Sequence, residues 1–303
     1  MKFIVDSSPA DFSWIHGGII VLHKLAKLLA DAGHDVYLVS PSTNKTLPNS
    51  KCKVISRDIA KELCSQHEVI AIYPEIIIGN PYGAKHVVRW LLYYPGALHN
   101  GQSVFDESEF VFAYQKAFVS DTIYEGSPPL FVLETNIDMF YPLDTPREYD
   151  AILIRKGNLN GQEQYNERYM KYFLPNAHLV TNQHIIFDQL IREDATPEEL
   201  NKHLNTIKYF VTFDHATYHS ILASLAGCIS VVIPVDGLEK EKWKQELPIV
   251  KYGVAYGFDD IDWAVQTRDD LKNRLYEIEI ENTTNVLNFI KLVEQKWDMH
   301  QSV

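Results

Sequence analysis

The chain has 303 residues, of which 46% are apolar, so sizeable cores are available and two domains of ordinary size are expected. Its 40 acidic and 28 basic side chains give a formal net charge of −12, which argues against nucleic acid or an anionic membrane as the main partner. Cys52, Cys64 and Cys228 are odd in number and lack metal-type spacing, which indicates free thiols in a reducing compartment and no structural zinc.

The N-terminus predicts no secretory signal, because the chain enters a strand at once, without a basic segment followed by an apolar one. No uninterrupted apolar run reaches membrane-spanning length, since the run at residues 69–79 contains Pro74 and Glu75. We therefore expect a cytoplasmic protein without stable membrane insertion. Peripheral association with a membrane stays open.

The first half of the chain predicts a parallel α/β domain. A helix at residues 17–32, with apolar residues on a helical period, lies between two short apolar runs and forms a βαβ unit with them. Proline-containing loops follow two further buried runs, and such loops share one crevice at the carboxyl ends of parallel strands. Strands are expected at residues 2–5, 35–40, 69–73, 86–92, 110–114, 117–119 and 130–134.

A polar segment with a proline at residues 144–150 interrupts this pattern and predicts a domain boundary. We expect a first domain at residues 1–145, a second at 146–283, and a terminal helix at 284–303 that packs back on the first. The second domain resumes the α/β alternation. Its strands are expected at residues 151–154, 178–181, 209–213 and 230–234, and helices at 163–173, 197–204, 271–278 and 285–297.

Residues 209–234 are the most informative segment, since they predict a strand, a polar loop, a helix and a second strand in close succession. Asp214, Thr217 and Ser220 are expected to cap this helix. A helix that starts at the carboxyl end of a parallel strand presents unpaired N–H groups that suit phosphate. This unit therefore predicts a nucleotide site.

Several segments resemble the GT-B glycosyltransferases. These are the Gly17-Gly18 loop with its helix, the segment LFVLETNIDMFYP, and Arg155-Lys156-Gly157 after the first strand of the second domain. More narrowly, YPEIIIGNPYGAKHVVRWLLYYPG, FDHATYHSILASLAGC and YGVAYG are similar to polysaccharide-building glycosyltransferases of bacteria and large viruses. The resemblance implies two Rossmann-like domains facing a cleft, with donor bound mainly by the second and acceptor by the first.

The resemblance also implies a hexosyl or deoxyhexosyl group transferred from a nucleotide diphosphate sugar to a glycan acceptor, without a metal or cofactor. Many retaining GT-B enzymes carry two glutamates eight residues apart in the second domain. His215 and Ala223 occupy those places here, which favours an inverting reaction.

Candidate donor contacts combine cations with free backbone N–H groups, which together offset the charge of a diphosphate. Arg155 and Lys156 could instead be exposed charges after a strand, and a helix start is the alternative for the two glycines. Capping and a surface imidazole are the alternatives for Asp214 and His215. The candidates are Gly17, Gly18, Arg155, Lys156, Asp214, His215, Thr217, Tyr218 and Ser220.

His215 and His219 could share a helical face, but no glutamate lies between them and no third ligand is adjacent, so no metal site is expected. Residues 259–262 have the letters of a D-x-D motif, and we interpret them as a solvated loop.

An inverting transfer needs a base, and Glu75 is the first candidate, because it follows a buried strand and a proline and burial raises a carboxyl pKa. It could instead anchor loop backbone. His16 and Asp11 are alternatives in the loop after the first strand.

Arg89, Trp90 and Tyr256 are candidates for acceptor or cleft contacts. Arg89 lies in an apolar strand and needs a partner, either Glu75 or an acceptor oxygen. Two other functions stay open: a sugar-nucleotide epimerase of the same fold, and a non-enzymatic two-domain protein that binds a small solute.

Overall fold

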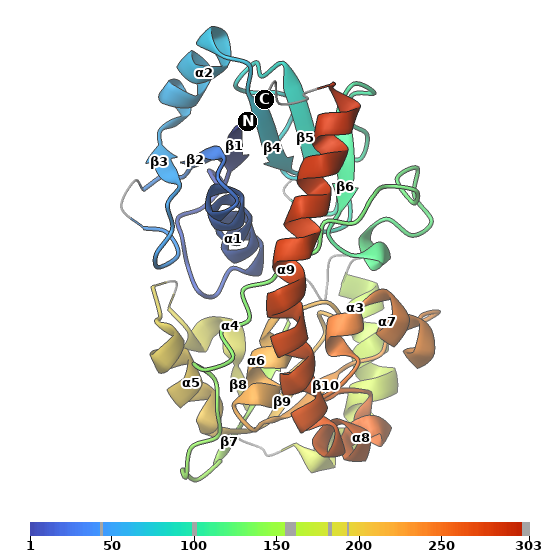
Figure 1. Cartoon of the computed structure of the whole chain (residues 1–303). Helices are drawn as coiled ribbons and strands as arrows, with labels where there is room; N and C mark the ends of the chain where they lie inside the picture. The colour runs from blue at the N-terminus through green and yellow to red at the C-terminus, as the bar shows by residue number, and fades with distance from the viewer. Residues whose placement is uncertain (43–44, 99–101, 155–161, 181–183, 193, 299–303) are drawn as a thin grey trace. The chain divides into compact units, whose positions relative to one another are not determined.

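The computed structural model describes residues 1–42, 45–98, 102–154, 162–180, 184–192 and 194–298, and the chain divides into two compact units. Unit 1 comprises Met1–Glu134 and Ile278–Val303, and unit 2 comprises Thr135–Glu277. Each unit contains a parallel sheet flanked by helices (Figure 1). The predicted fold class, α/β with two Rossmann-like domains, is confirmed.

Among the described residues of unit 1, sheet A has six parallel strands in the order β3-β2-β1-β4-β5-β6. The strands are β1 (Lys2–Asp6), β2 (Asp35–Val39), β3 (Lys53–Ile55), β4 (Ile70–Pro74), β5 (His86–Leu91) and β6 (Phe110–Ala113). The connecting elements include the helices α1 (Gly17–Asp31) and α2 (Arg57–Gln66) and the 3-10 turn η1 (Lys116–Phe118).

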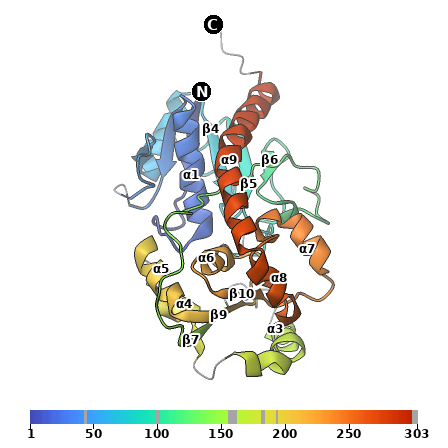
Figure 2. The same cartoon turned by 60° about the horizontal axis from the view of Figure 1, so that its bottom comes forward.

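Two helices cover one face of sheet A: α1 and the C-terminal part of α9 (Arg268–Lys296), which run side by side in Figures 1 and 2. Leu25 and Leu29 of α1 and Phe289 and Val293 of α9 join one core with the strands. On the other face, Ala60 of α2 packs in a second cluster of buried residues. Both faces are buried, which explains why the strands are continuously apolar.

Sheet B, in the described part of unit 2, has five parallel strands in the order β11-β10-β9-β7-β8. The strands are β7 (Tyr149–Leu153), β8 (His184–Ile186), β9 (Ile207–Thr212), β10 (Ile229–Val232) and β11 (Val254–Tyr256). The helices are α3 (Gln162–Arg168), α4 (Phe187–Leu190), α5 (Pro197–Asn205), α6 (His219–Leu225), α7 (Lys240–Glu246) and α8 (Ile261–Gln266). Shorter helical segments are η2 (Tyr169–Phe173), η3 (Leu174–Leu179), η4 (Pro248–Val250) and η5 (Phe258–Asp260).

The C-terminal region contains one helix where two were predicted. α9 is continuous over 29 residues, and it passes from unit 2 to unit 1 between Glu277 and Ile278. The predicted helices, at residues 271–278 and 285–297, leave out the residues between them. Asn282 is instead fully buried, where its side-chain amide accepts from the N–H of Leu133 (2.9 Å) and donates to the carbonyl of Leu133 (2.8 Å).

Three predicted strands are wrong. Residues 116–118 form η1. Residues 130–134 belong to no strand, and side chains of α9 instead bind the backbone of Phe131 and Leu133 in this segment. η3 occupies residues 174–179, where a strand was expected from residue 178.

The chain passes from unit 1 to unit 2 after Glu134, whereas the sequence predicts the domain boundary at residue 145. The intervening segment packs on α5 of unit 2: the N–H of Tyr141 donates to Asn201 Oδ1 (3.2 Å) and that of Leu143 to Asn205 Oδ1 (2.6 Å). In the polar segment 144–150 that predicts the linker, Thr145 Oγ1 donates to the carbonyl of Asn205 (3.2 Å) and Arg147 Nη2 donates to Asn205 Oδ1 (3.0 Å), so this segment also packs on α5.

Candidate active site

Loop residues 213–218 connect β9 to α6 at the carboxyl edge of sheet B. Asp214 is 4% exposed, its Oδ1 accepts from the N–H of Ala216 (3.1 Å), and its N–H donates to Thr212 Oγ1 (3.0 Å). Asp214 therefore closes a turn before the helix rather than capping the helix. The predicted cap at this residue is wrong.

α6 starts at His219 and follows Tyr218 at the N-cap, which makes no side-chain cap bond. Thr217 Oγ1 accepts a long hydrogen bond from the N–H of His219 (3.4 Å), so Thr217 comes nearest to the expected capping role. Ser220 lies inside the helix and is 1% exposed, which makes its predicted capping role wrong.

Two long-range contacts fix this loop from outside. The indole N–H of Trp243 in α7 donates to the carbonyl of His215 (2.9 Å), and the hydroxyl of Tyr218 donates to the carbonyl of Thr135 (3.0 Å). His215, Thr217 and Tyr218 are half-buried. The structure thus gathers five predicted donor-binding residues, Asp214, His215, Thr217, Tyr218 and Ser220, in one loop and the helical turn that follows.

Tyr256 is the last residue of β11, and its side chain binds the loop that follows β10 at the same edge of the sheet. Its hydroxyl donates to the carbonyl of Leu238 (2.7 Å) and accepts from the N–H of Val235 (2.9 Å). Its ring stacks on Trp243 at a centroid distance of 4.7 Å, and burial raises its pKa to about 12. Because the hydroxyl is bound to the loop, the predicted cleft contact of Tyr256 is replaced by a structural role.

Asp259 and Asp262 are exposed, but Asp260 is buried, so the prediction of a solvated loop at residues 259–262 is wrong for Asp260. Its carboxylate pairs with Lys240 (3.1 Å) and Lys244 (2.9 Å) of α7 and accepts from the N–H of Tyr256 (3.2 Å). Asp260 therefore joins α7 to the end of β11.

Arg168, the last residue of α3, is a cation at this edge that the sequence interpretation missed. It is 5% exposed, and its guanidinium donates to the carbonyls of Pro234 (2.9 Å), Phe213 (3.0 Å) and Ile233 (2.7 Å). Burial lowers its pKa. In the sequence, Arg168 lies between the aromatic residues Tyr165 and Tyr169 of a predicted helix. An arginine in this apolar setting was the signal that could have identified it.

The cationic pair predicted for the diphosphate, Arg155 and Lys156, lies outside the described residues, so the structure does not describe its contacts. It follows β7, which lies between β9 and β8 in sheet B.

In unit 1, the loop after β1 leads to α1. Asp11 is exposed and His16 is half-buried at the N-cap of α1, where its side chain makes no cap bond. Gly17 and Gly18 form the start of α1, and a Cβ on Gly18 would meet nothing closer than Leu92 Cδ1 at 3.9 Å. The helix-start interpretation of the two glycines therefore accounts for their positions.

Glu75 follows β4 at the carboxyl edge of sheet A and is 3% exposed. Its Oε2 accepts from the N–H of Leu92, the residue after β5, at 2.9 Å. The carboxylate is therefore buried beside two strand ends and also anchors loop backbone, as the second interpretation of this residue supposes.

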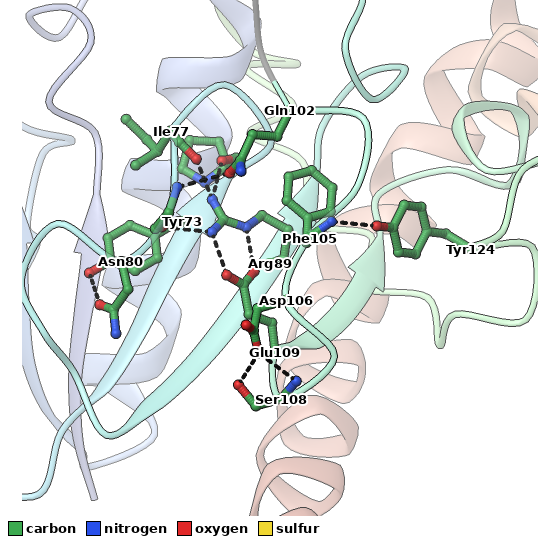
Figure 3. A network of polar contacts seen from close by, with 12 residues as sticks. Tyr73, Ile77, Asn80, Arg89, Gln102, Phe105, Asp106, Ser108, Glu109 and Tyr124 are labelled. Atoms are coloured by element: carbon green, nitrogen blue, oxygen red, sulfur yellow. Dashed lines mark hydrogen bonds and ion pairs between the residues drawn. The ribbon is translucent and has the colours of Figure 1, made fainter.

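Arg89 pairs with Glu109 and not with Glu75. Its Nε donates to Glu109 Oε2 (2.8 Å) and its Nη2 to Oε1 (2.9 Å), while the remaining N–H groups reach the carbonyls of Pro74, Ile77 and Gly79 (Figure 3). All five donors of the guanidinium are therefore used. The predicted contact of Arg89 with an acceptor is wrong, because no N–H group is left to make it.

Trp90 is also a core residue rather than a cleft residue. It is fully buried in the cluster under α1 and α9, and its indole N–H donates to the carbonyl of Leu130 (2.9 Å). The sheet alternation places Arg89 and Trp90 on opposite faces of β5.

Two further polar residues were missed, Asp6 at the end of β1 and His23 in α1. Asp6 is 1% exposed and accepts from the hydroxyl of Tyr82 (2.6 Å). His23 of α1 is fully buried, with Nε2 3.1 Å from Ser7 Oγ and Nδ1 3.0 Å from Thr46 Oγ1, and burial lowers its pKa to about 4. Nothing in the apolar period of the helix distinguished His23.

Among the described residues, no three His, Cys, Asp or Glu side chains gather as metal ligands. None of the helices in the described ranges combines the length and apolarity needed to span a bilayer.

Comparison with family models and with curated proteins finds no match. Solved structures do match over the whole chain. Sucrose-phosphate synthase from Thermosynechococcus elongatus is 11% identical, with 99% of this chain and 100% of that chain covered and a TM-score of 0.52. AviGT4, a glycosyltransferase involved in avilamycin A biosynthesis, is 13% identical, with 97% of each chain covered and a TM-score of 0.53.

At this level of identity the likeness concerns the fold. The two parallel sheets, each flanked by helices, and the match over nearly the full length of both proteins show that this chain has the GT-B fold of glycosyltransferases.

Proposed function

We propose that the protein transfers a sugar from a nucleoside diphosphate donor to a glycan acceptor, with the donor bound by unit 2. The observation that carries the proposal is the carboxyl edge of sheet B, where a buried cation, Arg168, lies among the strand-end carbonyls. Ligands of open parallel sheets bind at this edge. The fold shared with two glycosyltransferase structures supports the same assignment.

The charge of the diphosphate would be offset by side chains rather than by a metal. Arg155 and Lys156 follow β7, and the loop at residues 213–218 lies after its neighbour β9. Two cations that donate charge-assisted hydrogen bonds suit a departing diphosphate.

We further propose an inverting reaction in which Glu75 of unit 1 takes the proton from the acceptor hydroxyl. The absence of a glutamate at His215 and Ala223 supports inversion. Burial of Glu75 supports its role as a base, since a desolvated carboxylate holds a proton more readily. His16 and Asp11 are the other candidates in this unit.

Thermal unfolding in the presence of UDP, GDP, dTDP, CDP and ADP tests donor binding. A ligand at about one hundred times its Kd stabilises the folded state by about 2.7 kcal/mol, so one nucleotide should raise Tm clearly above the others. Arg155→Ala should remove most of that shift, whereas Arg192→Ala, an exposed arginine paired with Asp194, should leave it unchanged. The absence of any shift would contradict donor binding.

Product analysis with the nucleotide sugar identified in this way then tests the reaction. Incubation with glycan acceptors should give transfer, and incubation without acceptor should give slow hydrolysis of the donor. An epimerised nucleotide sugar as the only product would contradict the proposal.

A further inference from the structure

The turn that carries Glu75 is fixed by Arg89, whose contacts with Ile77 and Glu109 are seen in Figure 3. The Arg89 side chain is fully buried, and its Nη1 donates to the carbonyls of Pro74 (3.3 Å) and Ile77 (2.6 Å), on either side of Glu75. Its Nη2 donates to the carbonyl of Gly79 (2.8 Å). One guanidinium thus fixes the direction of three carbonyls within six residues of chain.

Glu109 orients the guanidinium in turn. The bidentate pair uses both carboxylate oxygens of Glu109, whose side chain is 5% exposed. The rings of Tyr73 and Phe105 lie 5.3 and 4.8 Å from the guanidinium carbon and limit its movement. A planar, fully paired guanidinium has one orientation here, so the turn has one as well.

The same strand also contacts the Glu75 carboxylate. Arg89 lies within β5, and Leu92, whose N–H binds Glu75 Oε2 at 2.9 Å, follows the end of that strand. β5 and the residue that follows it therefore hold both the backbone of the turn and the carboxylate of Glu75.

We propose that Arg89 is a positioning residue for Glu75, with Glu109 as its orienting partner. The inference rests on the proposed function, in which Glu75 is the base. A misplacement of about 1 Å at a reacting group costs up to about a hundredfold in rate. A buried ion pair, in contrast, contributes little net stability over apolar packing, so positioning gives this pair a function that stability does not.

The test is a double-mutant cycle on sugar transfer with Glu109→Gln and Glu75→Gln. Glu109→Gln should lower kcat by about 10- to 100-fold and leave the KM of the donor unchanged, because the turn shifts and unit 2 does not. In the Glu75→Gln background the same change should cost less than about twofold, since no base remains to be misplaced. A merely structural pair would give the same loss in both backgrounds.

Glu68→Gln is the matched control, because Glu68 is an exposed carboxylate of unit 1 that pairs with Lys85 and His86 (both 2.7 Å). It should leave kcat unchanged. A folded Glu109→Gln protein with wild-type kcat, or an equal loss in both backgrounds, would overturn the inference.

If Glu109→Gln does not fold, Gln102→Ala decides the question. Gln102 Oε1 accepts from the N–H of Gly79 (2.9 Å), so its removal loosens the far end of the turn without leaving a buried charge. A several-fold loss of kcat that disappears in the Glu75→Gln background supports positioning, and an unchanged kcat overturns it. Full activity of Glu75→Gln overturns this inference alone, whereas a wild-type protein without nucleotide binding, transfer or donor hydrolysis overturns the proposed function.

Discussion

At the scale of single residues, the two units use the same means to order the loops at their carboxyl edges. Arg89 collects the carbonyls of the turn after β4, and Arg168 collects those at the ends of β9 and β10. Backbone carbonyls at the end of a strand have lost their sheet partners, and buried ones need a donor. A guanidinium supplies five in one plane, which no other side chain does.

His23 gives a pH dependence that can be measured. Its pKa is lowered from 6.5 to about 4 by burial, so the unfolded chain binds this proton before the folded chain does. Stability is therefore unaffected above about pH 6.5 and falls as the pH drops from there towards about 4.

Relative to His23→Gln, the wild-type protein should lose about 2 kcal/mol of unfolding free energy between about pH 7.5 and about pH 5. Urea unfolding of both proteins at the two pH values measures the difference. A constant difference between them would show that His23 titrates normally in the folded state.

At the scale of elements, the sequence predicts most strands of sheet A, but it predicts neither the continuity of α9 nor the contacts of this helix. The strands β1, β4 and β5 follow from short apolar runs, and α1 from its period, since both depend on local pattern. The sequence predicts two helices where α9 is continuous through the polar residues Asn282 and Asn285. Their partners are backbone groups of residues 131–133, about 150 positions away in sequence, and no local pattern contains that information.

For the candidate site, too, the sequence predicts where residues lie but not which residues they contact. Strand ends and polar loops locate Glu75 and Asp214 correctly at carboxyl edges, because the edge is set by topology. Their contacts depend on residues from other elements, such as Leu92 for Glu75 and Glu109 for Arg89. The role of Arg168 depends on the packing of α3 against the ends of β9 and β10, and no local pattern in the sequence predicts that packing.

Asn282→Ala should lower the free energy of unfolding by about 3 kcal/mol, because it leaves the N–H and the carbonyl of Leu133 buried without a partner. Chemical denaturation measures the change. Asn288→Ala, an exposed position on the same helix, should stay within about 0.5 kcal/mol of wild type. Equal effects of the two substitutions would contradict the structural role of Asn282.

At the scale of the whole molecule, the chain passes between the units twice, after Glu134 and before Ile278. Lys24 of α1 is 5% exposed and pairs with a carboxylate beside each passage: Glu134 (3.2 Å) and Glu279 (2.6 Å). Both connections are therefore attached to the same helix of unit 1.

Lys24→Met should release this attachment. Because Glu279 is 44% exposed and solvent screens its charge, we expect a loss of only about 1–2 kcal/mol in stability. Amide hydrogen exchange should become faster at residues 131–134 and 278–282 and stay unchanged at residues 268–274. Lys27→Met, which removes a pair with Asp31 on the same helix, should have neither effect. Unaltered exchange in Lys24→Met would contradict the attachment.

The single helix α9 has a consequence for synthesis on the ribosome. Unit 1 is the first to be translated, yet Phe289 and Val293 of its core come after the whole of unit 2. Unit 2 is one contiguous stretch and can close its own core as soon as it has emerged. The face of sheet A that α1 and α9 cover therefore cannot be completed until unit 2 has been translated, because this part of α9 follows unit 2 in the sequence.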